Sequence, residues 1–173
     1  MRESIDISVS FNDSFDRQLR SHDGLFDPIS KLVIRLGETW ISGDGVYCEV
    51  RAVGFFTQLL TALDELAEGA TDRQIRLYGE TYLAFHRDGD ELTVAHRYSE
   101  AAIDDPNERL GIGAESTAKF TQVAQAALDG AEQVSGHVAA VIDDSDQSKL
   151  HRLNATIDEA KERFGEGQEN NSC

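Results

Sequence analysis

Four acidic residues lie within nine positions in the second half of the chain, and no basic residue lies among them. They are Glu100, Asp104, Asp105 and Glu108. Carboxylates gathered in this way attract a cation or the Lys and Arg side chains of a partner protein. Runs of charge also commonly face solvent without binding anything. We therefore predict that these four residues contact a basic partner, with a solvated loop as the alternative.

The five histidines could supply a metal site or a general base. His86 and His96 lie in neighbouring extended runs, 82–87 and 90–98, around an Asp-Gly pair that is typical of a two-residue hairpin turn. Pairing around that turn places His86 opposite Glu91 and puts the two histidines on opposite faces of the hairpin, so they cannot bind one ion. The remaining histidines, His22, His137 and His151, lie at no recognised zinc spacing.

Two motifs imitate known ligand sites without completing them. Asp144 and Asp146 resemble the start of a calcium-binding loop, but Lys149 stands where that loop needs glycine. Gly111 and Gly113 resemble the start of a phosphate loop that lacks its Lys-Ser/Thr pair. No serine has the Gly-x-Ser-x-Gly context of a nucleophile. We therefore expect no metal, no cofactor and no catalytic residue.

Charge is the strongest signal in the composition. The chain has 32 acidic and 16 basic residues and a formal net charge of −16. Nucleic acids and anionic membranes require a basic patch, and the sequence contains no cluster of Lys and Arg. We therefore expect neither as a partner. An acidic surface also suits a cell with high internal salt, which screens the charges.

The length of 173 residues is typical of one domain, which can bury a core without disulfides. We expect a single α+β domain over residues 1–164 and a disordered polar tail over 165–173. No run approaches the roughly 18 apolar residues of a membrane helix. Residues 1–6 lack the apolar stretch of a signal peptide, so we expect a cytoplasmic protein. Cys48 is predicted to be a buried small hydrophobe, and Cys173 ends the tail.

Hydrophobic periodicity predicts the elements that position these residues. Apolar residues at helical spacing predict amphipathic helices over 54–68, 115–135 and 145–164. Gly136 is expected to break or kink the second helix, and residues 138–142 either continue it or form a short strand. Residues 12–27 are predicted to form a loop, in which one helical turn is the alternative. Extended runs are expected over 4–11, 31–36, 39–41, 46–52, 74–78, 82–87 and 90–98. This order predicts an α+β fold, with an antiparallel sheet of about five or six strands covered by the three helices.

Part of this order is similar to a known family. It consists of Trp40, the alternating run 46–50, a Leu-rich helix over 55–63, a three-stranded meander over 74–98 and a late helix. Over about residues 31–134 the chain resembles small immunity proteins of the WapI type. That resemblance implies a single-domain, non-enzymatic binder that neutralises a secreted toxin. The resemblance implies no catalytic residue in this chain.

Several functions remain open. The missing catalytic motifs and the acidic surface favour a non-enzymatic binding protein with a basic protein partner. The alternative is an enzyme with a site assembled from scattered residues such as His22, His96, Asp104 and Glu108. A small structural or oligomeric protein is a third interpretation. The sequence leaves the identity of the partner and the oligomeric state open.

Overall fold

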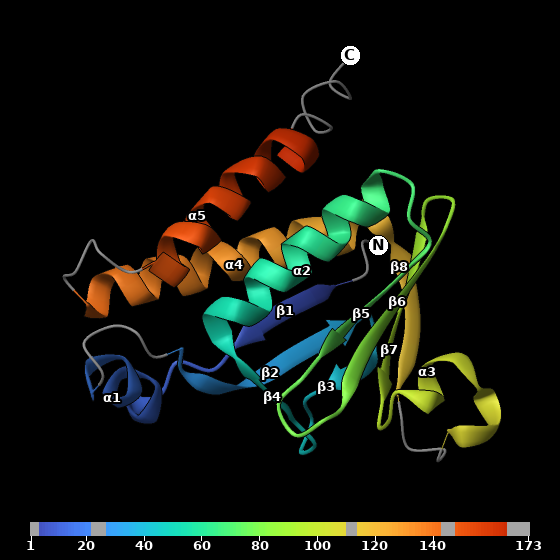
Figure 1. The fold of residues 1–173 in the computed structure, drawn as a ribbon, viewed down its shortest axis with the longest axis horizontal. Coiled ribbons are helices and arrows are strands. Elements are labelled where there is room, and N and C mark those ends of the chain that lie inside the picture. The colour runs from blue at the N-terminus through green and yellow to red at the C-terminus, as the bar shows by residue number, and fades with distance from the viewer. Residues whose placement is uncertain (1–3, 22–26, 110–113, 143–147, 166–173) are drawn as a thin grey trace.

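A computed structural model describes residues 4–21, 27–109, 114–142 and 148–165. The protein has an α+β fold, as the sequence predicts (Figure 1). The strands are β1 (Ile5–Val9), β2 (Ile29–Leu36), β3 (Thr39–Ser42), β4 (Cys48–Arg51), β5 (Asp72–Arg76), β6 (Tyr82–Asp88), β7 (Glu91–Arg97) and β8 (Glu115–Lys119). The helices are α1 (Asp13–Ser21), α2 (Ala52–Ala67), α3 (Ala101–Asp104), the 3-10 turn η1 (Pro106–Glu108), α4 (Phe120–Val141), α5 (Ser148–Ala160) and the π-helical turn η2 (Lys161–Gly165).

The strands form two antiparallel sheets of four strands each, where the sequence predicted one sheet of five or six. In the first sheet, β2 pairs with β1 along one edge and with both β3 and β4 along the other. The second sheet has the order β5-β6-β7-β8. A bridge between Glu49 and Tyr78 connects the two. The sequence did not predict the division into two sheets. The helix α2 lies between β4 and β5 in the chain, and no short-range sequence pattern indicates whether strands so far apart pair with each other.

Three long helices, α2, α4 and α5, gather on one side of the strands (Figure 1), and the sequence predicted all three. Two details of the prediction are wrong. Residues 115–119 are not the start of a helix but form β8, which pairs with β7. Gly136 does not end α4, which continues to Val141. Its position is exposed, and an exposed glycine costs a helix only about 1 kcal/mol relative to alanine.

The hairpin of β6 and β7 has a different register from the predicted one. Its turn is Gly89-Asp90, so Asp88 pairs with Glu91 and His86 lies opposite Thr93 rather than Glu91. Gly89 has a φ of 63°, a conformation that glycine adopts without strain at the first position of a two-residue turn. The pairing partners shift by two residues, and strand side chains alternate with a period of two. The predicted faces are therefore retained.

The core is continuous and draws on both sheets and on the three long helices. Leu63 of α2 is completely buried within it. Helix and sheet approach each other closely at Gly130 of α4, where an added Cβ would lie 2.2 Å from the carbonyl oxygen of Ile7. Only glycine lets α4 lie this close to β1.

The predicted loop over residues 12–27 contains a helix, α1, whose Phe15 and Leu19 are buried. Asn12 begins it, because its Oδ1 accepts a hydrogen bond from the backbone N–H of Phe15 at 3.0 Å. Two apolar residues four positions apart were too short a pattern to predict the helix. The predicted tail lies outside the described residues apart from Gly165, and so does Cys173.

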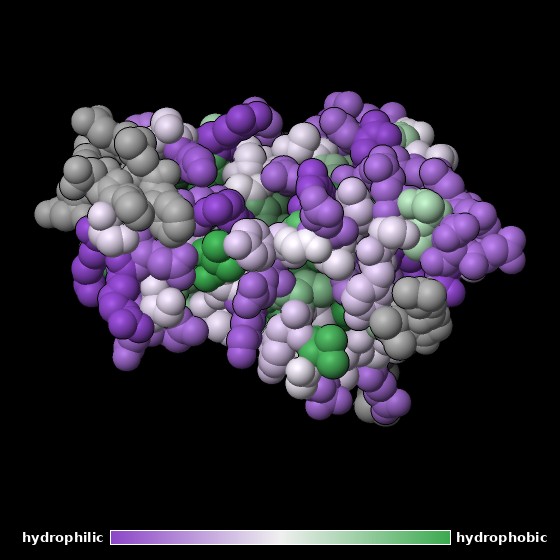
Figure 2. Space-filling view, turned by 60° about the horizontal axis from the view of Figure 1, so that its bottom comes forward, coloured by the Kyte–Doolittle hydropathy of each residue, from purple (hydrophilic) through white to green (hydrophobic). Residues whose placement is uncertain are grey.

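Hydrophilic residues cover most of the face in Figure 2, and hydrophobic residues show between them in small separate spots. Cys48 is buried, as predicted, and burial raises the pKa of its thiol. Among the described residues, no helix is both long enough and apolar enough to cross a membrane.

Candidate functional site

The predicted acidic residues surround two short helical turns rather than a loop. Glu100 precedes α3, Asp104 ends it, and Asp105 and Glu108 flank and end η1. All four side chains are exposed. Asp105 starts η1, because its Oδ1 accepts a hydrogen bond from the backbone N–H of Asn107 at 2.9 Å. We call residues 100–108 the acidic segment. Within the described parts of the chain, none of its four acids forms an ion pair with another residue.

Arg109 holds the acidic segment in place. Its Nε donates a hydrogen bond to the carbonyl oxygen of Ala102 at 2.7 Å, and its Nη2 donates to that of Ile103 at 2.9 Å. The backbone N–H of Ala102 donates to Ser99 Oγ at 3.2 Å, and the Ala102 side chain is buried. The segment is therefore presented in a defined shape.

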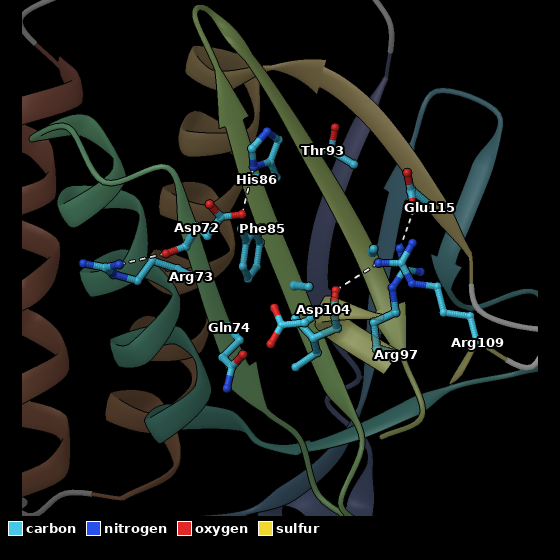
Figure 3. A pocket seen from close by; sticks show the side chains of 13 residues that line it. Asp72, Arg73, Gln74, Phe85, His86, Thr93, Arg97, Asp104, Arg109 and Glu115 are labelled. Carbon is cyan, nitrogen blue, oxygen red and sulfur yellow. Dashed lines mark hydrogen bonds and ion pairs between the residues drawn. The ribbon is translucent and has the colours of Figure 1, made fainter. Parts of the chain in front are cut away.

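A pocket of about 550 Å³ lies on the outer face of the second sheet, the face away from α2 (Figure 3). Its polar and charged lining includes Asp72, His86, Thr93, Arg97, Asp104 and Glu115. Asp104 is thus the one of the four acids that lines the pocket, beside Ile103 of the same segment. The structure places Glu100, Asp105 and Glu108 outside its lining.

Arg97 places a fixed positive charge in the wall of this pocket. It is 7% exposed and forms an ion pair with Glu115 on the neighbouring strand β8. Its Nη1 donates to the carbonyl oxygen of His96 at 3.3 Å, whereas its buried Nε has no hydrogen-bond partner among the described residues. Sequence reasoning missed this pair. Strand alternation from Thr93 predicts that Arg97 points to the outer face. Its partner Glu115 could not be predicted, because residues 115–119 were not expected to form a strand.

A polar row crosses all four strands of the outer face. Asp72, His86, Thr93 and Thr117 lie opposite one another in the register of the sheet. His86 Nδ1 lies 2.8 Å from Asp72 Oδ1, and this hydrogen bond is the main reason that the pKa of Asp72 is lowered. The hydroxyl oxygens of Thr93 and Thr117 are 2.7 Å apart.

The row does not have the geometry of a nucleophile and its base. That arrangement requires a hydrogen bond between the hydroxyl and the imidazole. The described contacts of Thr93 and His86 include none between them, because the hydroxyl bonds to Thr117 and the imidazole to Asp72. Both members of the His86–Asp72 pair are more than half exposed.

The histidines lie on opposite faces, as the sequence predicted. His96 is buried on the inner face, opposite Leu83, and its Nε2 has no hydrogen-bond partner among the described residues. Burial, with a smaller contribution from the charge of Arg97, lowers the pKa of His96. The alternative site combined His22, His96, Asp104 and Glu108, but His96 is buried on the inner face whereas Asp104 lines the outer-face pocket. His22 lies outside the described residues.

In the described ranges, no group of three or more His, Cys, Asp and Glu side chains is placed to hold a metal ion. The residues of the imitated calcium and phosphate loops lie largely outside those ranges. Comparisons of the chain with models of protein families, with curated proteins and with solved structures find no match. The function must therefore be argued from the site itself.

Proposed function

We propose that the protein acts by binding a partner with a basic surface, and that the acidic segment makes the first contact. The observation that carries this proposal is the four exposed carboxylates of residues 100–108, which form no ion pair within the described chain. Like charges held close together repel one another, and a basic partner relieves that repulsion. The opposite charge of such a partner also increases the rate of encounter.

The position of the segment supports the same interpretation. One of its four acids, Asp104, lines the outer-face pocket (Figure 3). A Lys or Arg side chain of the partner that enters there would contact Asp104 and lie near the row of Asp72 and His86. A toxin with a basic surface is the partner class implied by the resemblance to WapI-type immunity proteins, and it belongs to this proposal.

The experiment compares three forms of the protein as bait in lysate of its own cells. They are the wild type, the acidic-segment variant Asp104→Asn/Asp105→Asn/Glu108→Gln, and a control variant Asp6→Asn/Glu38→Gln/Asp158→Asn. Both variants remove three negative charges, but the control removes them elsewhere. We expect a basic protein to be retained by the wild type and the control and to be lost from the acidic-segment variant.

Association kinetics with the retained protein then test the mechanism. The acidic-segment variant should associate more slowly, with a weaker dependence on salt, because steering by complementary charge acts mainly on the association rate. Equal association rates for the two variants would attribute the effect to net charge and would contradict a contact at this segment. Failure of the wild type to retain any basic protein at any salt concentration would contradict the proposal as a whole.

A further inference from the structure

A second and larger hollow lies on the other side of β5, between that strand, most of the length of α2 and the start of α5. Its volume is about 860 Å³. The edge strand β5 separates it from the outer-face pocket, and Arg73 and Gln74 line both. Figure 1 shows α2 between α5 and β5, so the hollow is built by segments that are far apart in the sequence. We call it the helix groove.

The charge of the helix groove is opposite to that of the whole chain. Its described lining includes five of the chain's 16 basic residues but only two of its 32 acidic residues. The basic residues are Arg51, Arg73, Arg76, Lys149 and Arg152. The sequence contains no run of basic residues, which is why we expected no basic patch. The fold creates one from β4, β5 and α5.

Both acids of the helix groove already have partners. Asp27 is buried, and its two carboxylate oxygens accept hydrogen bonds from the backbone N–H groups of Val53 and Gly54 at 2.8 and 2.7 Å. Glu65 forms an ion pair with Arg73. The acids are therefore occupied, and positive charge dominates what the groove offers to a ligand.

The cations available to a ligand lie mainly on α5. Lys149 and Arg152 are both exposed, and neither lies within 4 Å of a carboxylate oxygen of another described residue. The charge of Lys149 also acts on the Asp27 carboxyl and partly opposes the rise of its pKa. Lys149 and Arg152 are three positions apart, so they lie on the same face of the helix. Arg76 of β5 is also among the lining residues and pairs with Glu80 at 2.9 Å, an exposed contact that a ligand can replace at little cost.

The floor of the groove is apolar. Val50, Phe55, Ile75 and Leu77 line it, and the exposed ring of Tyr78 stands at its edge. Sites for small molecules commonly measure about 300–1,000 Å³ and combine an apolar lining with a few polar groups that fix orientation. The helix groove has this size and this composition.

We infer that the helix groove binds a small organic phosphate, with the phosphate at Lys149 and Arg152 and an apolar body against the floor. A phosphate monoester carries nearly two negative charges at neutral pH and forms charge-assisted hydrogen bonds with Arg and Lys. It therefore neutralises the excess positive charge of the lining better than a carboxylate does. This site is separate from the acidic segment and does not depend on the function proposed there.

Phenyl phosphate tests the inference, with inorganic phosphate, phenol and benzoate as comparison probes. Binding is measured by NMR titration of the full chain at about 0.15 M salt, where charges more than about 8 Å apart are largely screened. We expect saturable binding of phenyl phosphate, shifts at the amides of Thr57, Gln58 and Thr61 in the groove wall, and clearly weaker binding of the other three probes.

Two charge-matched variants locate the site. Lys149→Gln/Arg152→Gln removes two exposed cations from the groove, and Lys31→Gln/Lys119→Gln removes two exposed cations elsewhere. The first should weaken binding of phenyl phosphate about tenfold or more, as expected from the loss of charge-assisted hydrogen bonds. The second should leave binding unchanged. All four positions are exposed, and circular dichroism checks that both variants fold.

Three results would overturn the inference. The wild type could show no saturable binding of phenyl phosphate, or the control variant could lose as much affinity as the groove variant. Benzoate could also bind as tightly as phenyl phosphate, which would remove the assignment to phosphate.

Discussion

The inner and outer faces of the second sheet are made by the same strands but differ in almost every physical respect. On the inner face Leu83, Phe85, Leu92 and Val94 are at most 2% exposed and join the continuous core. On the outer face the polar row of Asp72, His86 and Thr93 borders an open pocket. No long helix of the described chain covers that face (Figure 1). The stability of the fold therefore depends on the inner face. The side chains of the outer face are not needed for the core and are available to bind a partner.

This comparison predicts where substitutions are costly, and the helix-covered side should give the largest effect. Gly130→Ala would place a Cβ 2.2 Å from the carbonyl oxygen of Ile7 and 2.7 Å from the ring of Phe56. Relief requires α4 and β1 to move apart, so we expect a loss of about 3 kcal/mol in the free energy of unfolding. Chemical denaturation measures it.

Gly136→Ala on the same helix is the matched control. An added Cβ there meets no atom within 4 Å, so alanine should stabilise α4 by up to about 1 kcal/mol. A similar change in stability for both variants would contradict the close contact with β1 as the cause of the loss at Gly130.

The second largest effect is expected at Asp27, which caps α2 from a distant part of the chain. Asp27→Ala leaves the backbone N–H groups of Val53 and Gly54 without their acceptor. A lost helix cap and unsatisfied buried donors together cost about 1–3 kcal/mol. A variant with wild-type stability would show that water replaces the carboxylate.

The pH dependence at Asp27 sharpens this prediction. Burial is the largest influence on this carboxyl group and raises its pKa above the ordinary 3.8. The folded protein therefore holds the proton more tightly than the unfolded chain does. The resulting stabilisation is complete below pH 3.8 and is lost as the pH rises through the folded pKa. The difference in the free energy of unfolding between the wild type and Asp27→Asn should therefore decrease as the pH rises from 3.8 through the folded pKa. Chemical denaturation at several pH values measures it.

The sequence predicted the inner face far better than the outer one. The helix around Leu63 follows from repeated apolar spacing, because burial of one stripe is a requirement that the local sequence must satisfy. The hairpin register was missed because an Asp-Gly-Asp run allows two turn positions, and both leave Leu83 and Phe85 on the same face. Packing against the rest of the protein selects between them.

The sites follow the same division. The acidic segment is continuous in sequence, so its exposed carboxylates could be predicted. The Arg97–Glu115 pair depends on β8 being a strand, and the helix groove joins Arg51 to Arg152 across most of the chain. Such sites are created by tertiary structure, which periodicity within one segment does not specify. Asp27 was missed as a cap for the same reason.

A smaller effect is expected for His96, a polar side chain on the otherwise apolar inner face. Burial lowers its pKa below the ordinary 6.5, so the unfolded chain binds the proton more tightly. The stabilisation is complete above pH 6.5 and is lost as the pH falls through that value towards the folded pKa. The maximum slope for one proton is about 1.4 kcal/mol per pH unit.

His96→Leu should remove this slope from denaturation measured between pH 5 and 8, and at neutral pH it should change stability by only about 1 kcal/mol or less. The substitution removes a buried nitrogen that has no hydrogen-bond partner among the described residues. The exposed His151 provides the control, and His151→Gln should retain the slope. If His96→Leu retained it too, another group would be responsible.

The smallest effect on stability is expected on the outer side, at the acidic segment. The variant Asp104→Asn/Asp105→Asn/Glu108→Gln should unfold within about 0.5 kcal/mol of the wild type at moderate salt, because exposed substitutions rarely cost more. The amide oxygen introduced by Asp105→Asn can still accept the hydrogen bond from the backbone N–H of Asn107 that begins η1.

Salt should raise the melting temperature of the wild type, because it screens the self-repulsion of a chain with a net charge of −16; we expect the rise as KCl increases from about 0.01 to 1 M. The variant has three fewer negative charges, so its melting temperature should rise less over the same range. Thermal melts of both proteins test this directly. A wild-type midpoint that stays flat or falls would contradict self-repulsion, and a variant that loses several kcal/mol would place the acidic segment among the elements that stabilise the fold.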